Sequence, residues 1–528
     1  MRMFGPPAVT AAASLALSLG LVSPLQAGHA SFEVLGYSDL VARLGGSAPD
    51  GSGVIVAQVE VPDGDGDYGP NKGATHYVGK TFHEESGPTS TSSHANGVAQ
   101  FQYGNLFSMA AGVNEIYLYE VEDWLTGGFL RWGAGPTIPP LPLPADISSI
   151  NHSWVGTASS SAGNNEALRR ADWVINRDNV MMTDGVNNDP PNRELMSHLY
   201  NSISVGVIGG IHVSDDTLPG ADGPGRQKPE IVAGPNDFTS FATPMINAIN
   251  SVLVETARTE LSGNPSAERT DILKATILAG AAHVDEHNGE WSNNPKRSGP
   301  NRGVTTTPID DVVGVGTANV NRSHFILTAG EFDGASTPPG ATNAALEGWD
   351  LASVGIGDSR YYRFRMPFDA DEVSILATWN RWVAPQFDDW ALADFDLILW
   401  RVGAGGSLHS LVGDGGLPYF QAGNVVSEST VDNIEHLYIN GLEAGEYAIE
   451  LRRQDADTKI DPWDAAVAWI IRDPSTSPED IDADGVVSFS DLLLLLSAWG
   501  PCFGCPEDID GNGVVGLSAL ILVLSAWD

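Results

Sequence analysis

Residues 54–61 read VIVAQVEV, an apolar run rich in β-branched residues that carries a glutamate at position 60. A short run of this kind predicts a buried β-strand. Similar runs occur at 115–121 (EIYLYEV) and 203–208 (ISVGVI), and residues 243–258 have a helical pattern. Because strands alternate with helices between about residues 51 and 321, we predict an α/β fold with a mostly parallel sheet flanked by helices.

The pattern changes near residue 334, where the helical signals end. Short strand-like runs separated by Gly- and Asp-rich turns follow at 373–379, 395–402, 436–439, 447–452 and 465–471. This pattern is typical of a β-sandwich, which we assign to residues 334–473. Four aromatic residues there could line a carbohydrate platform, but packing is the expected role of Trp379, Trp382, Trp390 and Trp400.

The composition restricts the partners of the chain. It has 528 residues with 67 acidic and 27 basic side chains, so the formal net charge is −40 and the pI is about 4.4. Hydrophobic residues make up 42% of the chain, enough for a folded core. Nucleic-acid binding needs clustered cations, and an anionic membrane would repel this chain. We therefore exclude nucleic acid and expect cationic partners, divalent metals or a saline medium.

The N-terminus has the pattern of a secretory signal peptide. Arg2 precedes an apolar stretch at 8–25, and Ala27 offers a cleavage site, with Ala30 as a second choice. We assign residues 1–27 to this signal and expect the mature protein to be secreted, extracellular or associated with the cell surface. An N-terminal membrane anchor is the alternative. No later run of about 18 apolar residues could span a bilayer.

The chain contains two cysteines, Cys502 and Cys505, in a C-x-x-C arrangement. Since export permits disulfides, we expect a local bridge between them. One such pair is also half of a zinc site, but no second pair or nearby His completes it.

The C-terminal region repeats a pattern of alternating acidic residues. Residues 480–491 read DIDADGVVSFSD, with carboxylates at loop positions 1, 3, 5 and 12 and Gly485 at position 6. Carboxylates at alternate positions converge on one point and supply the oxygen ligands that Ca²⁺ prefers. A second unit begins at Asp508 but has Ala519 at its twelfth position. The predicted calcium ligands are Asp480, Asp482, Asp484, Val486, Ser488 and Asp491 in the first loop, and Asp508, Asp510, Asn512 and Val514 in the second.

These two loops, each followed by a Leu-rich run, resemble a type I dockerin domain. The motif D-G-x-V-x-x-x-D-L-L-L-L-L and the S-A-W ending of both repeats, at 497–499 and 525–527, carry the resemblance. It implies that residues 478–528 form a small α-helical module that folds around calcium and docks onto a cohesin-like partner or the cell envelope.

Three segments of the first region carry side chains suited to nucleophilic catalysis. Glu60 ends the first strand, and the segment SHANGVA at 93–99 places His94 at the start of a predicted helix. The segment TSFATP at 239–244 starts another helix, with Ser240 at its N-terminus and Pro244 in its first turn. The dipole of that helix favours negative charge developing nearby. A Ser, a His and a carboxylate are the components of a catalytic triad.

In this order the segments resemble the subtilisin-like serine peptidases, or subtilases. TSFATPM at 239–245 closely matches their nucleophile motif, and SHANGVA matches their H-G-T-H-V-A more loosely. Further matches are the substrate-pairing strand at 150–156, the stretch before the nucleophile at 228–233 and the closing G-x-G-x-V-N segment at 311–320. The resemblance implies an α/β subtilisin-like catalytic domain over residues 31–330 that hydrolyses a protein or peptide substrate.

Site residues are carried over by the same resemblance. Ser240 would be the nucleophile and His94 the general base, with Glu60 in the position usually held by Asp. The oxyanion hole normally uses an Asn after a buried strand, and here Asn187 takes that place, with Asn188 close behind.

Three departures from the family pattern lie near the expected site. They are the Glu at position 60, Phe238 where a Gly usually precedes Thr-Ser, and the separation of Gly185 from Asn187 by one residue. They leave a second hypothesis open, in which the chain is a catalytically inactive subtilase-fold protein with an extracellular binding or scaffold role. The neighbouring DGDGD at 63–67 lacks a closing carboxylate at Ala74, and we interpret it as an acidic surface turn.

Overall fold

The computed structural model describes residues 10–11, 30–214, 217–284, 287–340, 343–455, 458–472, 479–481, 487–502, 505, 507–509 and 514–527. The predicted signal peptide therefore lies outside the described residues except at 10–11, and so do five predicted calcium ligands, Asp482, Asp484, Val486, Asp510 and Asn512. Among the described helices, none combines the length and the apolar character that a bilayer span requires.

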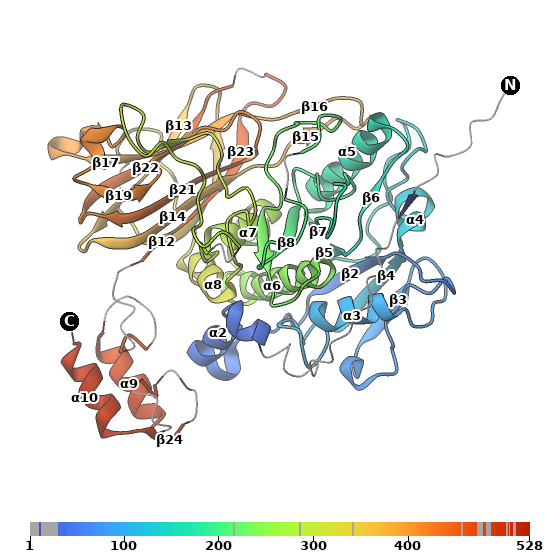
Figure 1. Cartoon of the computed structure of the whole chain (residues 1–528), viewed down its shortest axis with the longest axis horizontal. Helices are drawn as coiled ribbons and strands as arrows, with labels where there is room; N and C mark the ends of the chain where they lie inside the picture. The colour runs from blue at the N-terminus through green and yellow to red at the C-terminus, as the bar shows by residue number, and fades with distance from the viewer. Residues whose placement is uncertain are drawn as a thin grey trace.

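A parallel sheet of seven described strands forms the centre of the first half of the chain (Figure 1). In spatial order the strands are β3 (Thr81–Glu84), β4 (Glu115–Glu120), β2 (Ile55–Glu60), β5 (Ile147–His152), β7 (Met181–Gly185), β8 (Ile203–Val207) and β9 (Ile231–Ala233). All neighbouring pairs run parallel, which confirms the predicted α/β fold. The carboxyl ends of parallel strands meet at one edge, where such sheets place their ligand sites.

Helices pack on both faces of this sheet. Val56 of β2 belongs to a buried cluster that includes residues of α3 and α6, whereas its neighbour Ala57 belongs to a cluster with residues of α5. Successive strand side chains point to opposite faces, so an unbroken apolar run buries both. The longer helices are α2 (Tyr37–Leu44), α3 (Ser93–Gln102), α5 (Ser161–Asp178), α6 (Thr239–Glu260), α7 (Thr270–Ala279) and α8 (Val320–Ala329). Shorter elements are β1 (Thr10–Ala11), α4 (Val121–Asp123) and β6 (Gly156–Thr157).

The second half of the chain forms two further sheets, mostly antiparallel, at the orange end of the molecule in Figure 1. One contains β12 (Glu347–Val354), β23 (Trp463–Arg472), β14 (Ala370–Thr378), β21 (Ile434–Leu442) and β19 (Phe420–Gly423). The other contains β10 (Val304–Thr305), β20 (Val426–Ser427), β17 (Phe395–Val402), β22 (Gly445–Arg453), β13 (Ser359–Met366) and β11 (Asn343–Ala344), with β18 (Leu408–Ser410) on β17. Ile375 of the first sheet and Leu397 of the second belong to the same buried cluster, so the sheets share a core.

The two halves of the chain are continuous in packing. Trp349 and Ala468 of the five-stranded sheet lie in the same buried cluster as Leu278 of α7 and Leu327 of α8. Helices α7 and α8 therefore lie between the parallel sheet and the first antiparallel sheet. In addition, β10 belongs to the region 31–330 but pairs with β20 of the second half, so the two predicted domains do not separate at a single point in the sequence.

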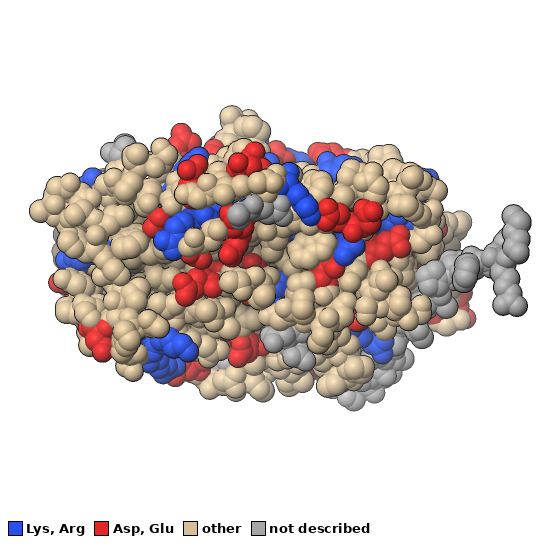
Figure 2. Space-filling view, turned by 90° about the horizontal axis from the view of Figure 1, so that it is seen from above, with Lys and Arg blue, Asp and Glu red and all other residues tan. Residues whose placement is uncertain are grey.

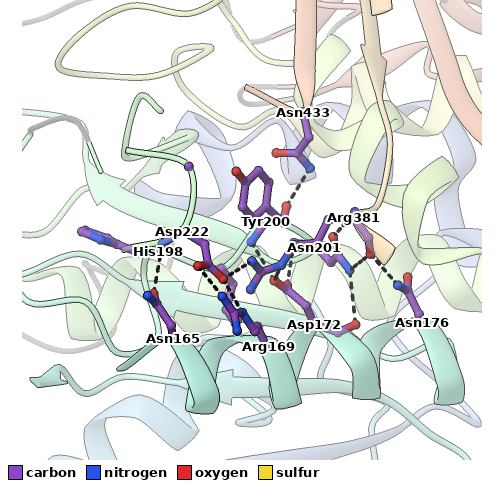
Figure 3. A network of polar contacts seen from close by, with 12 residues as sticks. Asn165, Arg169, Asp172, Asn176, His198, Tyr200, Asn201, Asp222, Arg381 and Asn433 are labelled. Atoms are coloured by element: carbon purple, nitrogen blue, oxygen red, sulfur yellow. Dashed lines mark hydrogen bonds and ion pairs between the residues drawn. The ribbon is translucent and has the colours of Figure 1, made fainter. Parts of the chain in front are cut away.

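Buried charges join the halves at a second place (Figure 3). Arg381 is fully buried and lies in the segment of chain that connects β14 to β15 (Trp382–Val383). Strand β15 pairs with β16 (Trp390–Ala391). The Arg381 guanidinium donates to Asp172 on α5 and, at 2.9 Å, to Asp222. Arg169 on α5 donates to Asp222 at 2.7 Å. An unpaired charge at this depth would be costly, so these pairs hold the two halves in one arrangement.

The four tryptophans considered for a carbohydrate platform make packing contacts. Trp379 is fully buried and donates through Nε1 to the Ala393 carbonyl at 2.8 Å. Trp400 donates to Glu450 Oε2 at 2.7 Å, and the Trp390 ring centroid lies 5.5 Å from the Arg381 guanidinium. Trp382 lies in β15 and is half-buried. These contacts favour a packing role over a carbohydrate platform.

The C-terminal region has a small core of its own. It contains α9 (Phe489–Ser497), α10 (Leu517–Ser525) and the paired β24 (Gly500–Pro501) and β25 (Val514–Val515). Val487, Leu495, Val515, Ala519 and Val523 are buried together. Cys502 and Cys505 form the expected local disulfide.

Charged residues of both signs are mixed on one face of the molecule (Figure 2). On the face seen in Figure 2, Lys and Arg side chains lie interspersed with Asp and Glu rather than gathered in one basic patch.

Candidate active site

The predicted catalytic residues meet at the carboxyl ends of the central strands. Glu60 is the last residue of β2, whereas His94 and Ser240 are the second residues of α3 and α6. His94 and Ser240 line one cavity of about 120 Å³, together with Ser153 after β5 and Gly185 at the end of β7. Positions 60, 94 and 240 are thus brought together from three separate elements.

Glu60 and His94 form a direct pair. His94 Nδ1 lies 2.8 Å from Glu60 Oε2. The Glu60 side chain is 1% exposed, whereas the His94 side chain is 36% exposed. Burial opposes protonation of the imidazole, but the charge of Glu60 and its hydrogen bond together raise the pKa of His94 above its ordinary value. The extra methylene of Glu60, compared with Asp, is accommodated with the imidazole in hydrogen-bond contact.

The hydroxyl and the carbonyl of Ser240 both form hydrogen bonds with Ser153. The Ser240 Oγ donates to the backbone carbonyl of Ser153 at 3.4 Å, and among the described contacts no hydrogen bond joins Ser240 Oγ to His94. The Ser240 carbonyl accepts from Ser153 Oγ at 2.9 Å. Catalytic hydrogen bonds are often long or misaligned in unliganded enzymes, so this arrangement is compatible with a nucleophile at rest.

Pro244 explains why the Ser240 carbonyl needs Ser153 as a hydrogen-bond donor. The prediction placed Pro244 in the first turn of its helix, but α6 begins at Thr239, so Pro244 is the sixth helical residue and lies in the second turn. A proline has no N–H, and in a helix that N–H would bond the carbonyl four residues earlier, which is that of Ser240. Ser153 Oγ supplies the missing donor.

Two groups at the start of α6 are available to a ligand. At the start of a helix the backbone N–H groups lack the usual carbonyl four residues earlier. The Phe241 N–H bonds to the Phe238 carbonyl, whereas the Ser240 N–H has no partner in the described structure. Asn188 is half-buried, lines the cavity and accepts from the Thr239 N–H through Oδ1 at 2.9 Å. Asn187 also lines the cavity, but its Nδ2 donates to the Pro191 carbonyl at 2.7 Å. Asn188 therefore has the freer amide nitrogen of the two.

Phe238 does not obstruct the site. It caps α6 with φ −133° and ψ 130°, an extended conformation that any residue adopts, so no glycine is required there. Its side chain is 37% exposed and contacts the Phe241 ring with centroids 6.3 Å apart. Phe238 is not among the residues that line the cavity.

In the acidic turn after β2, a side-chain carboxylate accepts hydrogen bonds from backbone N–H groups of the same turn. Asp63 Oδ1 accepts from the N–H groups of Asp65 and Asp67, both at 3.0 Å. Asp63 and Asp65 are exposed, and Asp63 lies at the rim of the cavity. This agrees with an acidic surface turn.

The described part of the first predicted calcium loop is compatible with a cation site. Asp480 is 8% exposed and Asp491 is fully buried. Asp491 accepts from the Ile481 N–H through Oδ1 and from the Ser488 N–H through Oδ2, both at 2.7 Å. The first bond brings the two ends of the loop together. Two buried carboxylates at the ends of one loop fit the oxygen ligands that Ca²⁺ requires.

One residue at the site was missed by sequence reasoning. Ser153 was placed in the substrate-pairing segment and given no role toward Ser240. The available signal was Pro244, because a proline four residues after a candidate nucleophile leaves a carbonyl that needs another donor.

No protein-family model matches this chain, and no curated protein matches it in sequence. One similar solved structure is the prenylagaramide maturation protease PagA, at 14% identity and a TM-score of 0.35, covering 58% of this chain and 98% of that one. Another is a protease from Pseudoalteromonas arctica, at 13% identity and a TM-score of 0.34, covering 55% of this chain and 97% of that one. Similarities at this level carry no information about the activity of this chain.

Proposed function

We propose that the chain is a secreted serine endopeptidase of the subtilisin-like type, which hydrolyses peptide bonds through an acyl-enzyme. The observation that carries the proposal is that His94 and Ser240 line one cavity, with His94 Nδ1 2.8 Å from Oε2 of the buried Glu60. Such a pair fixes the imidazole tautomer, which leaves Nε2 as the base.

The reaction follows from these roles. Ser240 Oγ attacks the carbonyl carbon of the scissile peptide bond while its proton passes to His94 Nε2. The tetrahedral oxyanion is stabilised by the Ser240 N–H and by the amide of Asn188, with Asn187 as the other candidate. His94 then gives the proton to the leaving amine, and the acyl group stays on Ser240. Water attacks the ester with His94 again as base, which releases the acid and restores the serine.

A second function, an inactive extracellular binding or scaffold protein, is favoured by one observation. Ser240 Oγ donates to the Ser153 carbonyl rather than to His94. If that arrangement persisted with substrate bound, the hydroxyl would not be activated.

The C-terminal module is proposed as a calcium-dependent, dockerin-like tether. Asp480, Ser488 and Asp491 would contribute ligands, and calcium would neutralise buried carboxylates and hold the loop closed. Apolar residues exposed by 41–66% recur at matching positions of the two helices: Phe489, Leu493, Leu496 and Trp499 beside α9, and Leu517, Ile521, Leu524 and Trp527 beside α10. An apolar surface of this kind supports docking onto a cohesin-like or cell-envelope partner. The Cys502–Cys505 disulfide is compatible with an extracellular location.

Labelling with a fluorophosphonate probe tests the enzymatic proposal. The wild-type protein, with calcium present, should be labelled and should cleave an unfolded protein substrate. Ser240→Ala should abolish both signals, and His94→Gln should reduce labelling by at least about a hundredfold because the serine loses its base. Absence of labelling in a folded wild-type sample would favour the binding protein instead.

A further inference from the structure

A buried glutamine lies beside the Glu60 carboxylate. Gln58 precedes Glu60 by two residues on β2, so both side chains point to the same face of the sheet. Both residues are 0% exposed. Gln58 Nε2 donates to Glu60 Oε1 at 2.9 Å and to the Ala95 carbonyl at 2.9 Å. Because Ala95 follows His94 in α3, one amide group links the carboxylate to the helix that carries the imidazole.

The orientation of this amide is determined by its surroundings. Tyr103, also fully buried, donates its hydroxyl proton to Gln58 Oε1. Burial, with contributions from Tyr77 and Glu60, raises the pKa of Tyr103 well above its ordinary value, so the phenol stays protonated. If the amide were reversed, its oxygen would face the Glu60 carboxylate and the Ala95 carbonyl, neither of which can donate. The orientation with Nε2 toward Glu60 and Ala95 and Oε1 toward Tyr103 is therefore the one that gives each of these groups a hydrogen-bond partner.

This arrangement addresses the difficulty that a glutamate creates in a triad. A Glu side chain has one more rotatable bond than Asp, and a carboxylate held only by His94 could rotate out of reach. Gln58 donates a hydrogen bond to Glu60 Oε1, so the other carboxylate oxygen, Glu60 Oε2, stays directed at His94 Nδ1. We propose that Gln58, held by Tyr103, is a positioning residue that keeps Glu60 in the conformation that orients His94. Its effect on turnover rests on the proposed function, whereas its effect on His94 does not.

Two methionine variants test this role. Gln58→Met keeps the length of the side chain and removes the donor. Gln102→Met is the matched control, because Gln102 is another fully buried glutamine whose Nε2 donates to the Ala57 carbonyl and Asn247 Oδ1, both at 3.0 Å, and not to Glu60. The readout is the pKa of His94 in the full-length protein, from NMR of ¹³C-labelled imidazole with His94→Gln to assign the signal.

We expect the His94 pKa to fall toward its ordinary value in Gln58→Met and to stay at the wild-type value in Gln102→Met. In peptide hydrolysis, Gln58→Met should lower kcat about tenfold with KM unchanged, since ground-state binding of the substrate is not altered. Tyr103→Phe keeps the ring and removes the hydroxyl, and should shift the His94 pKa in the same direction by less. Adding Tyr103→Phe to Gln58→Met should cause no further shift, because both act through one amide.

An unchanged His94 pKa in Gln58→Met and Tyr103→Phe would overturn the proposal, and so would an equal shift in the Gln102→Met control. If Gln58→Met does not fold, Tyr103→Phe decides alone. If the wild-type protein cleaves no peptide, the proposed function fails, but the titration of His94 still decides the role of Gln58.

Discussion

Ser153 and Ser240 are joined by reciprocal hydrogen bonds: Ser153 Oγ donates to the Ser240 carbonyl at 2.9 Å, and Ser240 Oγ donates to the Ser153 carbonyl at 3.4 Å. The first bond replaces the helical bond that Pro244 cannot make, and it holds the start of α6 against the end of β5. The second is long for an O–H···O bond. Little is therefore lost when the Ser240 hydroxyl turns toward His94.

The relation between Ser153 and Pro244 can be tested with a double variant. Ser153→Ala should lower the free energy of unfolding by about 1 kcal/mol, because it leaves the Ser240 carbonyl without a donor. Pro244→Ala restores a helical N–H, so Ser153→Ala/Pro244→Ala should recover most of that loss. Urea unfolding of the four proteins measures this coupling. Additive effects in the double variant would show that the two residues do not serve the same carbonyl.

The raised pKa of His94 predicts opposite pH dependences for activity and stability. Hydrolysis needs the neutral imidazole, so kcat/KM should rise with pH through a pKa above 6.5. The His94–Glu60 pair stabilises the fold with the imidazole charged, so its contribution is complete below the unfolded pKa and is lost as pH rises through the folded pKa.

The pH profile of kcat/KM and thermal unfolding of the wild type and His94→Gln measure both effects. The stability difference between the two proteins should shrink with rising pH. An acid limb of kcat/KM below 6.5 would contradict the assignment.

The two asparagines near Ser240 should differ in effect. Asn188→Ala should lower kcat by about 10²–10³-fold if its amide stabilises the oxyanion. Asn188→Asp keeps the oxygen that accepts from the Thr239 N–H and removes the amide donor, so it should lose as much activity with less effect on folding. Asn187→Ala should mainly cost stability, about 1 kcal/mol, through its bond to the Pro191 carbonyl. A larger kcat loss for Asn187→Ala would reverse the assignment.

The buried pair between the halves should be important for stability. Arg381→Met leaves Asp172 and Asp222 without this partner, so we expect a loss of about 3–5 kcal/mol in the free energy of unfolding. The matched control is Arg297→Met, because Arg297 is 71% exposed and its contact to Glu290 is 3.6 Å, which should make its loss at most about 1 kcal/mol. Chemical unfolding of both variants provides the comparison. Equal losses would mean that the buried pair has no special role.

Calcium binding should depend on Asp491. Calorimetric titration of the full chain with Ca²⁺ should show at least one site in the wild type, and Asp491→Asn should weaken it because a charged ligand is lost. The amide keeps one acceptor oxygen for the N–H groups that Asp491 now holds, so the loop should suffer less than in an alanine variant. Equal calcium affinity in wild type and Asp491→Asn would remove Asp491 from the site.

Many elements of the fold were predicted correctly from the sequence. The runs at 54–61, 115–121 and 203–208 became β2, β4 and β8, and the run at 395–402 became β17 with the same limits. Such predictions succeed because a strand or helix is encoded by local periodicity. The approach of Glu60 and His94 was also predicted, through the resemblance of their segments to a known catalytic order, and the structure brings them to 2.8 Å.

By itself, the sequence determined the alternation of strands and helices, the candidate triad, the acidic surface and the repeated loops, because each is a local property of neighbouring residues. Only the tertiary structure decided that Ser153 serves the Ser240 carbonyl, that Asn188 has a freer amide than Asn187, and that Arg381 is buried between Asp172 and Asp222. These contacts join residues far apart in the chain. The demand that every buried polar group find a partner is satisfied by whichever groups the fold brings close, and no local pattern encodes that choice.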